Sequence, residues 1–486
     1  MLFLYAPVLT MGPVAEDFQW AYKGWSTLRH PASFLQPFHQ HLRPAGRLFF
    51  LISANLFGDR WYLYRLVTLA SMACLALLAY HVLRKTVKLR PGLAAAGILV
   101  WLASPFSDEV LFVTNQVKQI LFATGILLVL QARRSQSRMA PALLVAGTAL
   151  AFGSKEEAAV LPALLLLQDL LLFRLPFRHA ARHLIPWVTI SLLYLALYNM
   201  LVHFEARWFY SEPLTALPHL ATTWMAFWHL HPPVLGQFTM VLRKTWPLVL
   251  GALVLTAVAT VPAWRKDDRT AAFGFLAAIV LLSPTLPANI HTSRYTFLPF
   301  LFFLSGVLAG VRTLARWHLP RLATLALGLT LLTVMANDSI IVRGDRMDWD
   351  RYATLTARLR RESRPVISAL RDGSHVAAIR GRDGSALKEL LHHPRGVPKI
   401  YFPRPDDPYG VTSLSALVSW ELRHEGIAAP RLVEPIAIPA VVYLVHDTGG
   451  FRKVPPLPGA LSRPFGAGVV ILHPVPGDSF NPDVFP

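Results

Sequence analysis

The sequence has few of the residues on which disulfide-bonded and water-soluble proteins depend. Its 486 residues include one cysteine, and 15% are charged. Cys74 lies in an apolar run, so an intramolecular disulfide framework and a cysteine-based zinc site are excluded. Asp and Glu number 28 against 47 Lys and Arg. Met1–Met11 lacks a basic beginning and a small-residue cleavage site, so no cleavable signal peptide is expected.

Apolar residues make up most of the chain. Hydrophobic residues account for 54% of it, and the mean hydropathy is +0.42. This composition predicts an all-α polytopic membrane protein. Eleven apolar runs are expected to span the membrane, at about residues 1–12, 62–83, 92–105, 112–131, 139–153, 158–173, 184–203, 246–263, 271–287, 296–311 and 322–341. The first is short for a full span, which leaves open a start upstream of Met1.

Positive charge is distributed unevenly between the loops. Five clusters fall on alternate loops: Arg84, Lys85, Lys88, Arg90; Arg133, Arg134, Arg138; Arg174, Arg178, Arg182; Arg265, Lys266, Arg269; and Arg312, Arg316, Arg321. The short loops of the other parity carry Lys155 and Arg294. The positive-inside rule therefore predicts a cytoplasmic N-terminus in the plasma membrane, and the Ala-, Leu-, Arg- and Pro-rich composition favours a bacterial inner membrane. Basic clusters between apolar runs, despite a pI near 10.4, indicate a membrane and no nucleic-acid partner.

The outer face receives two long loops and the C-terminal tail. Residues 13–60 and 204–245 are the loops, and 213–231 is expected to be an interfacial helix. Residues 1–341 are then a transmembrane domain, and 342–486 a small extracytoplasmic α/β domain. That domain is expected to hold a helix near 348–370 and strands at Ala440–Val445 and Gly468–Leu472. No 34-residue repeat is present in it.

Four outer segments carry polar motifs in a fixed order. Glu16-Asp17-Phe18 follows the first apolar run, and Arg43-Pro44 leads through an amphipathic stretch to Gly58, Asp59 and Arg65. Ser154-Lys155-Glu156 precedes an apolar run that contains Pro162, and Arg294-Tyr295 with Pro299 opens a late span. In this order the chain resembles the GT-C glycosyltransferases, in the branch of protein O-mannosyltransferases, aminoarabinose transferases and TPR-bearing O-mannosyltransferases. It departs from that pattern in having Glu-Asp as its acidic pair and no TPR array.

The resemblance implies a GT-C fold, and an enzyme that moves a sugar from a polyprenyl-phosphate donor to an acceptor hydroxyl on the extracytoplasmic face. Such a transfer needs a base for the hydroxyl proton and cations for the leaving phosphate. Asp17 is the expected base, with direct inversion, and Glu16 supports it. The cations Lys155, Arg294, Arg43 and Arg47 are expected to bind the phosphate, and Asp108, Glu109, Glu156 and Tyr295 to line the pocket.

Simpler interpretations exist for each residue. On this view Glu16 and Asp17 are solvated charges at a helix end. The four cations then only anchor the chain at lipid headgroups. As an alternative to lining the pocket, Glu156 pairs with Lys155. Asp108 and Glu109 are then ordinary carboxylates at a helix start. Asp169 is expected to pair with Arg174 or Arg178.

No histidine spacing predicts a metal site. Some members of the family use a divalent cation and others do not, and Glu16, Asp17 and Asp108 would hold one here. Two other functions stay open: a transporter or flippase of a lipid-linked or anionic solute, and a non-catalytic membrane scaffold. The acceptor, whether protein, lipid or polysaccharide, is not encoded in any motif.

Overall fold

The fold is known from a computed structural model of the chain. It describes residues 5–13, 15–29, 31–35, 42–133, 135–202, 216–229, 238–265, 268–286, 293–314, 333–344, 346–347, 350, 353–354, 376–380, 441–445, 451–454 and 469–471. Two compact units result. One holds residues Met1–Val8, Ala32–Leu48 and Arg65–Gly344, and the other Leu9–Pro31, Phe49–Tyr64 and Asp345–Pro486.

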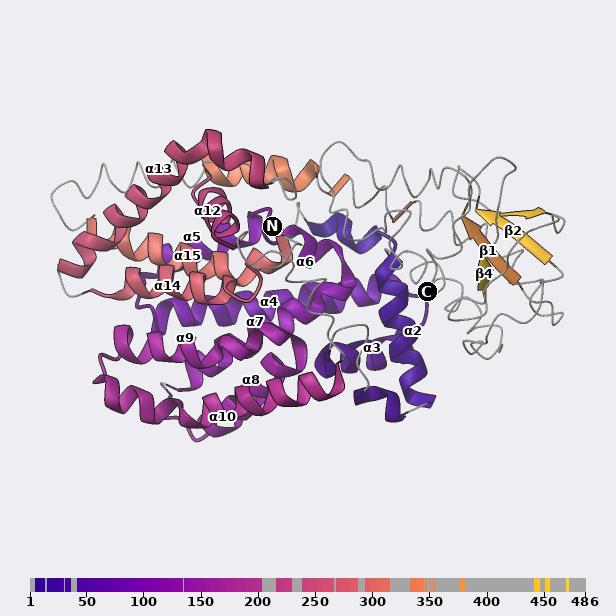
Figure 1. Cartoon of the computed structure of the whole chain (residues 1–486), viewed down its shortest axis with the longest axis horizontal. Helices are drawn as coiled ribbons and strands as arrows, with labels where there is room; N and C mark the ends of the chain where they lie inside the picture. Colours follow the sequence, from indigo (N-terminus) through magenta and orange to yellow (C-terminus); the bar gives the residue numbers. More distant parts are fainter. Residues whose placement is uncertain are drawn as a thin grey trace. The chain divides into compact units, whose positions relative to one another are not determined.

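The described residues are mostly helical (Figure 1). The N-terminal part has η1 (Ala6–Thr10), α2 (Ala15–Arg29), η2 (Pro31–Leu35), α3 (Pro44–Phe57) and α4 (Trp61–Lys85). The middle has α5 (Pro91–Ala103), α6 (Asp108–Phe112), η3 (Thr114–Gln116), α7 (Val117–Ala132), α8 (Ala140–Ser154), η4 (Glu156–Val160), α9 (Leu161–Leu167), η5 (Gln168–Leu172) and α10 (Phe177–Leu201). Then follow α12 (Ala216–Phe227), α13 (Phe238–Arg265), α14 (Thr270–Leu282) and α15 (Ser293–Leu314), and residues 333–344 are helical.

Within the first unit, helices pack in close pairs. α7 lies against α8 and α14 against α15. Glycines permit both approaches, because a Cβ on Gly125 would lie 2.5 Å from the Ala151 nitrogen and one on Gly274 would lie 2.4 Å from the Gly306 nitrogen. Small residues at such contacts are the usual means by which membrane helices pack without a hydrophobic driving force.

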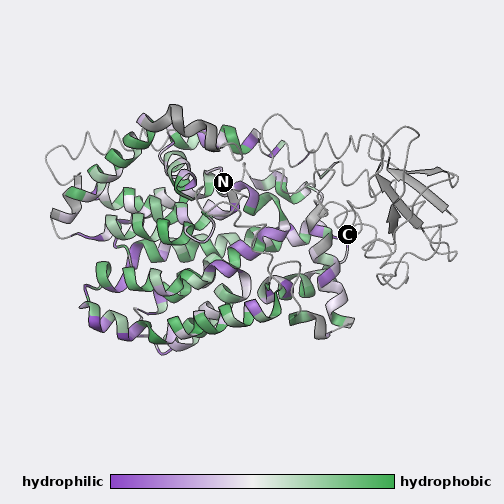
Figure 2. Cartoon of the chain, in the orientation of Figure 1, coloured by the Kyte–Doolittle hydropathy of each residue, from purple (hydrophilic) through white to green (hydrophobic). Residues whose placement is uncertain are grey.

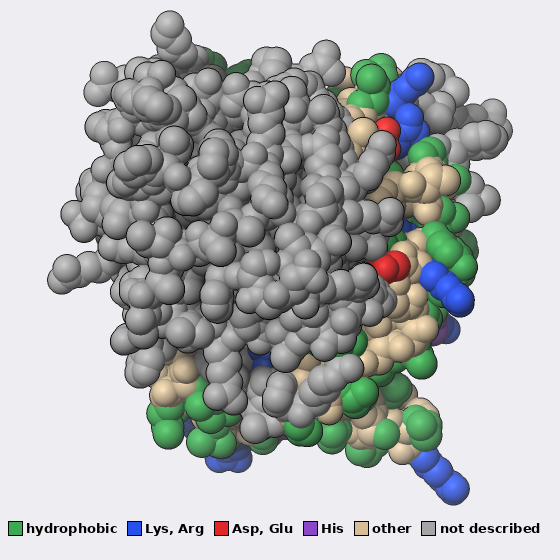
Figure 3. Space-filling view, turned by 90° about the vertical axis from the view of Figure 1, so that its right-hand side faces the viewer, with side chains coloured by type: hydrophobic (Ala, Val, Ile, Leu, Met, Phe, Trp, Pro, Cys, Tyr) green, Lys and Arg blue, Asp and Glu red, His purple; other side chains and the backbone are tan. Residues whose placement is uncertain are grey.

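Exposed apolar side chains identify the chain as a membrane protein. Apolar residues dominate these helices (Figure 2). In Figure 3, hydrophobic side chains of the described residues are visible along the right-hand and lower edges, and Lys and Arg side chains project from the same edges. α10 exposes Ile185, Leu192, Leu193 and Met200. Its apolar window is 17% buried, against 83% for α15, so α10 lies at the periphery and α15 inside the bundle. Lipid contact explains such a surface, which a water-soluble protein rarely tolerates.

Among the described residues, three helices are long and apolar enough to cross a membrane: Trp61–Lys85, Phe177–Leu201 and Arg294–Thr313. Five shorter apolar helices coincide in whole or part with α3, α5, α8, α13 and α14. In the described part of the first run the 3₁₀ helix η1 contains Pro7 and is followed by Pro13, and the proline rings remove backbone donors. The number of eleven spans and the side of each terminus stay predictions.

The second unit contains a four-stranded sheet. Its strands are β1 (Val376–Arg380), β2 (Val441–Val445), β3 (Phe451–Val454) and β4 (Val469–Ile471), in the order β3-β2-β1-β4. β1 is parallel to β2 and β4, with Val376 opposite both Val441 and Val469, and β2 is antiparallel to β3. β2 and β4 lie in the stretches predicted as strands. Most of the helix predicted near 348–370 lies outside the described residues, and a separate domain at 342–486 stays a prediction.

Candidate phosphate-binding site

Three cations from distant parts of the sequence lie together in the first unit. Lys155 occupies the extended turn between α8 and η4, with φ −155° and ψ 147°. Arg294 is in the first turn of α15, and Arg43 directly precedes α3. Lys155 Nζ lies 4.5 Å from the Tyr295 ring centroid, and the Arg294 guanidinium carbon lies 5.1 Å from it. The structure therefore brings Lys155, Arg294 and Tyr295 into one place. The three cations are called the cation cluster below.

Each member of the cation cluster has a carboxylate partner. Lys155 Nζ lies 2.6 Å from Glu157 Oε1, and Arg43 Nη2 lies 2.9 Å from Glu156 Oε2. Glu156 was expected either to line the pocket or to pair with Lys155. The pairing with Lys155 is wrong, since the extended backbone at Lys155 turns Glu156 to Arg43 and leaves Glu157 as the lysine's partner. Glu157 was not predicted.

The third partner, Glu109, comes from α6. Arg294 Nη1 lies 3.5 Å from Glu109 Oε1, and the Arg294 backbone N–H donates to Glu109 Oε2 over 3.3 Å. Glu109 thus contacts the chain at the start of α15, and its place in a donor pocket stays a prediction. Asp108 caps the backbone N–H of Glu109 with its carboxylate and is almost fully buried. Both therefore also have the helix-start role that was the alternative for them.

Burial makes it costly to keep all three residues of the cation cluster charged. Burial of Lys155, together with the charges of Arg43 and Arg294, lowers the pKa of Lys155 to about 8, although Glu157 acts in the opposite direction. Snorkelling into water was the alternative for these cations, but the Lys155 side chain is 2% exposed and that of Arg43 7%. Because the pKa of Lys155 is lowered even beside Glu157, an anion bound at the cluster would stabilise the protonated lysine.

Arg47 adds a donor beside Arg43. It lies one turn along α3, and its N–H donates to the Arg43 carbonyl over 3.0 Å. Its side chain is 5% exposed, and Nη1 makes no hydrogen bond to a described atom. A buried guanidinium N–H without a hydrogen bond to the described part of the protein can bind an oxygen of a ligand or of water.

The predicted acidic pair lies in α2, within the second unit. Asp17 is in the first turn and is fully buried, so it is not a solvated surface charge. The neighbouring Phe18 packs edge-on against Trp61, with ring centroids 5.0 Å apart. The Glu16 side chain lies outside the described residues. That Asp17 converges with Lys155 and Arg294, which belong to the other unit, stays a prediction.

Two further expectations concern other polar residues. Asp169 pairs with Arg133, at 2.8 Å, and the expected pairing with Arg174 or Arg178 is wrong. The cause is the π-helical turn η5, which directs Asp169 to the end of α7. Among the described residues no group of three His, Cys, Asp or Glu side chains is placed to hold a metal ion. His219 instead contacts the Leu286 carbonyl through Nδ1, at 2.8 Å.

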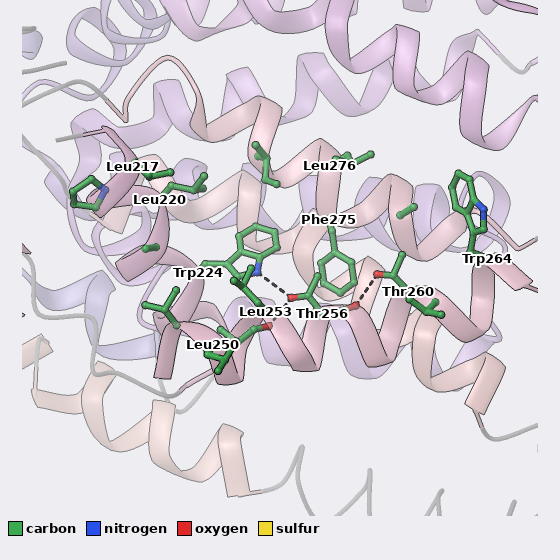
Figure 4. A pocket seen from close by; sticks show the side chains of 17 residues that line it. Leu217, Leu220, Trp224, Leu250, Leu253, Thr256, Thr260, Trp264, Phe275 and Leu276 are labelled. Carbon is green, nitrogen blue, oxygen red and sulfur yellow. Dashed lines mark hydrogen bonds between the residues drawn. The ribbon is translucent and has the colours of Figure 1, made fainter. Parts of the chain in front are cut away.

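An apolar groove lies between α12, α13 and α14 (Figure 4), with a volume of about 1120 Å³. The Trp224 and Trp228 indole N–H groups both donate to Thr256 Oγ1, which fixes α12 against α13. Lining side chains such as Leu217, Leu253 and Phe275 carry no charge, so the groove fits a hydrocarbon chain and has no catalytic group.

Comparisons with known proteins gave two structural likenesses. No family model matches the chain, and no curated protein matches it. The crystal structure of ArnT from Cupriavidus metallidurans bound to undecaprenyl phosphate is similar at 15% identity and a TM-score of 0.41, over 87% of this chain and 75% of ArnT. The structure of the same protein in the apo state gives 16% identity and a TM-score of 0.39, over 85% and 73%.

Proposed function

We propose that the chain is a membrane glycosyltransferase of the GT-C type. It moves a sugar from a polyprenyl-phosphate donor to an acceptor hydroxyl on the extracytoplasmic face of a bacterial inner membrane. The observation that carries the proposal is the cation cluster, in which buried Lys155, Arg294 and Arg43 lie together. Lys155 and Arg294 both face the Tyr295 ring. Buried cations of this kind suit a phosphate, and the apolar groove suits the lipid chain that the phosphate carries.

The cluster supplies what the leaving group needs. As the bond between the sugar and the phosphate breaks, negative charge develops on the phosphate oxygens, and fixed cations in a dry site stabilise it. Arg294 and Arg43 stay protonated, and their planar groups can each donate to two oxygens. The carboxylates Glu109, Glu156 and Glu157 keep the cations in place before the donor binds.

Asp17 is proposed as the base that removes the proton of the acceptor hydroxyl, with Glu16 in support. Attack from the side opposite the phosphate then inverts the anomeric carbon in one step. Asp17→Asn keeps the size and removes proton acceptance, so transfer should fall about 10²-fold or more while insertion is unchanged. Unchanged transfer in Asp17→Asn would assign the base elsewhere. No metal is needed by this scheme, and the carboxylates that would hold one are Glu16, Asp17 and Asp108.

Binding of a lipid phosphate tests the proposal. The protein in nanodiscs is titrated with undecaprenyl phosphate, and Lys155→Met and Arg294→Gln should each weaken binding about tenfold or more. Lys85→Met and Arg138→Gln change exposed cations of the predicted cytoplasmic face and are the matched controls. Equal losses in controls and test variants would mean general attraction to charge, and would contradict a phosphate site at the cluster.

Two other functions make different predictions for the same protein. A transporter or flippase would move the lipid between leaflets without consuming the sugar-phosphate bond. A non-catalytic scaffold would bind the lipid and leave Asp17→Asn without effect. We favour the enzyme because the proposed transfer needs both a carboxylate base and phosphate-binding cations, whereas a carrier or a scaffold needs no base.

A further inference from the structure

A second buried polar pair lies in the first unit, apart from the cation cluster. Asp338, in the helical residues 333–344, is fully buried, and Nδ1 of His229 lies 3.4 Å from its Oδ1. Neither carboxyl oxygen of Asp338 makes a hydrogen bond to a described atom. A buried carboxyl group is costly without hydrogen-bond donors, so this one calls for donors from water or from a ligand.

The backbone holds His229 in an unusual conformation. His229 follows α12 with a φ of +56°, in the left-handed region, and its N–H donates to the Ala226 carbonyl over 2.9 Å. The edge of its ring faces Phe300, with centroids 6.3 Å apart, and its side chain is 24% exposed. A non-glycine residue is uncommon in this region, although histidine is enriched there, and such a residue often ends a helix. The conformation places one ring nitrogen at Asp338 while part of the ring stays accessible.

This pair is connected to the cation cluster through neighbouring residues. Asp338 and Asp108 both act electrostatically on the Tyr5 hydroxyl. Asp108 adjoins Glu109, the partner of Arg294. Along α15, Phe300 lies six residues after Arg294, which is a rise of roughly 9 Å. Phe300, which the His229 ring faces, and Arg294 therefore lie within two turns of one another on α15.

We propose that His229 and Asp338 bind hydroxyl groups of the sugar that the polyprenyl-phosphate donor carries. The inference rests on the proposed function, and it names a sugar-binding subsite beside the phosphate site. With the proton on Nδ1, which lies 3.4 Å from Asp338 Oδ1, Nε2 of His229 is an acceptor. Nε2 then accepts a hydrogen bond from one hydroxyl, and the second Asp338 oxygen can accept from another.

The chemistry of the pair excludes the other parts of the donor. The phosphate has no hydroxyl hydrogen to donate in its diester form, and a hydrocarbon chain would leave the Asp338 oxygens without donors. Burial lowers the pKa of His229, so the imidazole is neutral at pH 7 and offers an acceptor, not a positive charge. Hydroxyl groups are the donors that a lipid-linked sugar has in abundance.

The test compares a lipid phosphodiester without a sugar with four that carry different sugars. Native mass spectrometry measures binding of undecaprenyl methyl phosphate, which has no sugar, and of undecaprenyl-phosphate glucose, mannose, galactose and arabinose. For the preferred sugar, the ratio of its affinity to that of the methyl diester should fall about tenfold in His229→Gln and in Asp338→Asn. Binding of the methyl diester itself should be unchanged in both variants.

Asp268→Asn is the matched control. Asp268 pairs with Arg312 over 2.5 Å, near the far end of α15, and its loss should leave the ratio unchanged. If Asp338→Asn does not fold, the more exposed His229→Gln decides alone. A ratio unchanged in His229→Gln, or no sugar bound better than the methyl diester, would overturn the subsite. Failure of the methyl diester to bind, with no effect of Lys155→Met, would overturn the proposed function instead.

Discussion

At the residue scale, the ionisation of Lys155 makes anion binding depend on pH. Burial lowers the pKa of Lys155 to about 8, so the free protein loses this positive charge as the pH rises through 8. The affinity for a lipid phosphodiester, whose own charge is constant, should therefore fall about tenfold between pH 7 and pH 9.5. Lys155→Arg, which stays protonated, should show no such fall. Parallel pH profiles for the two proteins would contradict the role of Lys155.

Tyr295 gives a second prediction at this scale. Its ring faces both Lys155 and Arg294, so the aromatic face stabilises the two cations before an anion arrives. Tyr295→Phe retains the ring and loses only the hydroxyl, which accepts a hydrogen bond from Arg294, so it should bind undecaprenyl phosphate more tightly than Tyr295→Leu. Tyr295→Leu loses the ring and should weaken binding roughly 3- to 30-fold, measured in nanodiscs. Equal affinities of Tyr295→Phe and Tyr295→Leu would show that the ring does not matter.

Some of these residues could be found from the sequence and others could not. Lys155 and Arg294 stand out because cations are scarce on the predicted outer turns. Glu157 and the His229–Asp338 pair gave no signal, since their partners are fixed by an extended turn and by helices about a hundred residues apart. Asp169 was assigned the wrong partner because nearby arginines in the sequence were preferred to Arg133, which the π-turn η5 brings closer.

At the scale of elements, hydropathy predicts the existence of helices better than their form. The runs at 62–83, 92–105, 139–153 and 271–287 match α4, α5, α8 and α14 within a few residues. A helix, α12, lies in the stretch 213–231, and its place at the membrane interface stays a prediction. The π-turn η5 inside the run at 158–173 and the 3₁₀ helix η1 were not foreseen, because hydropathy reports burial in lipid and not the backbone hydrogen-bond pattern.

The contact between α14 and α15 leads to a stability prediction. A methyl group on Gly274 would overlap the backbone of Gly306, so Gly274→Ala must push the helices apart. We expect a loss of about 1–3 kcal/mol in the free energy of unfolding, seen as a lower thermal midpoint in detergent. In α5, a Cβ on Gly92 would have no neighbour within 4 Å, so Gly92→Ala should be neutral. A Gly274→Ala midpoint equal to that of Gly92→Ala would refute the close packing.

At the scale of the whole molecule, the sequence predicts a membrane protein, and the exposed apolar faces of α10 and α13 agree. Its topology rests on loop charge alone. With basic residues on alternate loops, eleven spans place the C-terminus outside, so a phosphatase reporter fused after Pro486 should be active in the periplasm. A reporter active only in the cytoplasm would overturn the eleven-span topology. Removal of residues 345–486 should then impair acceptor use more than donor binding.

The arrangement of Asp17 and the cation cluster decides the account as a whole. The most direct measurement is an experimental structure of the protein with undecaprenyl phosphate. The account predicts the phosphate within about 3 Å of Lys155 Nζ and the Arg294 guanidinium, and Asp17 facing it across one cavity. A phosphate bound elsewhere, or Asp17 more than roughly 15 Å from both cations, would contradict it.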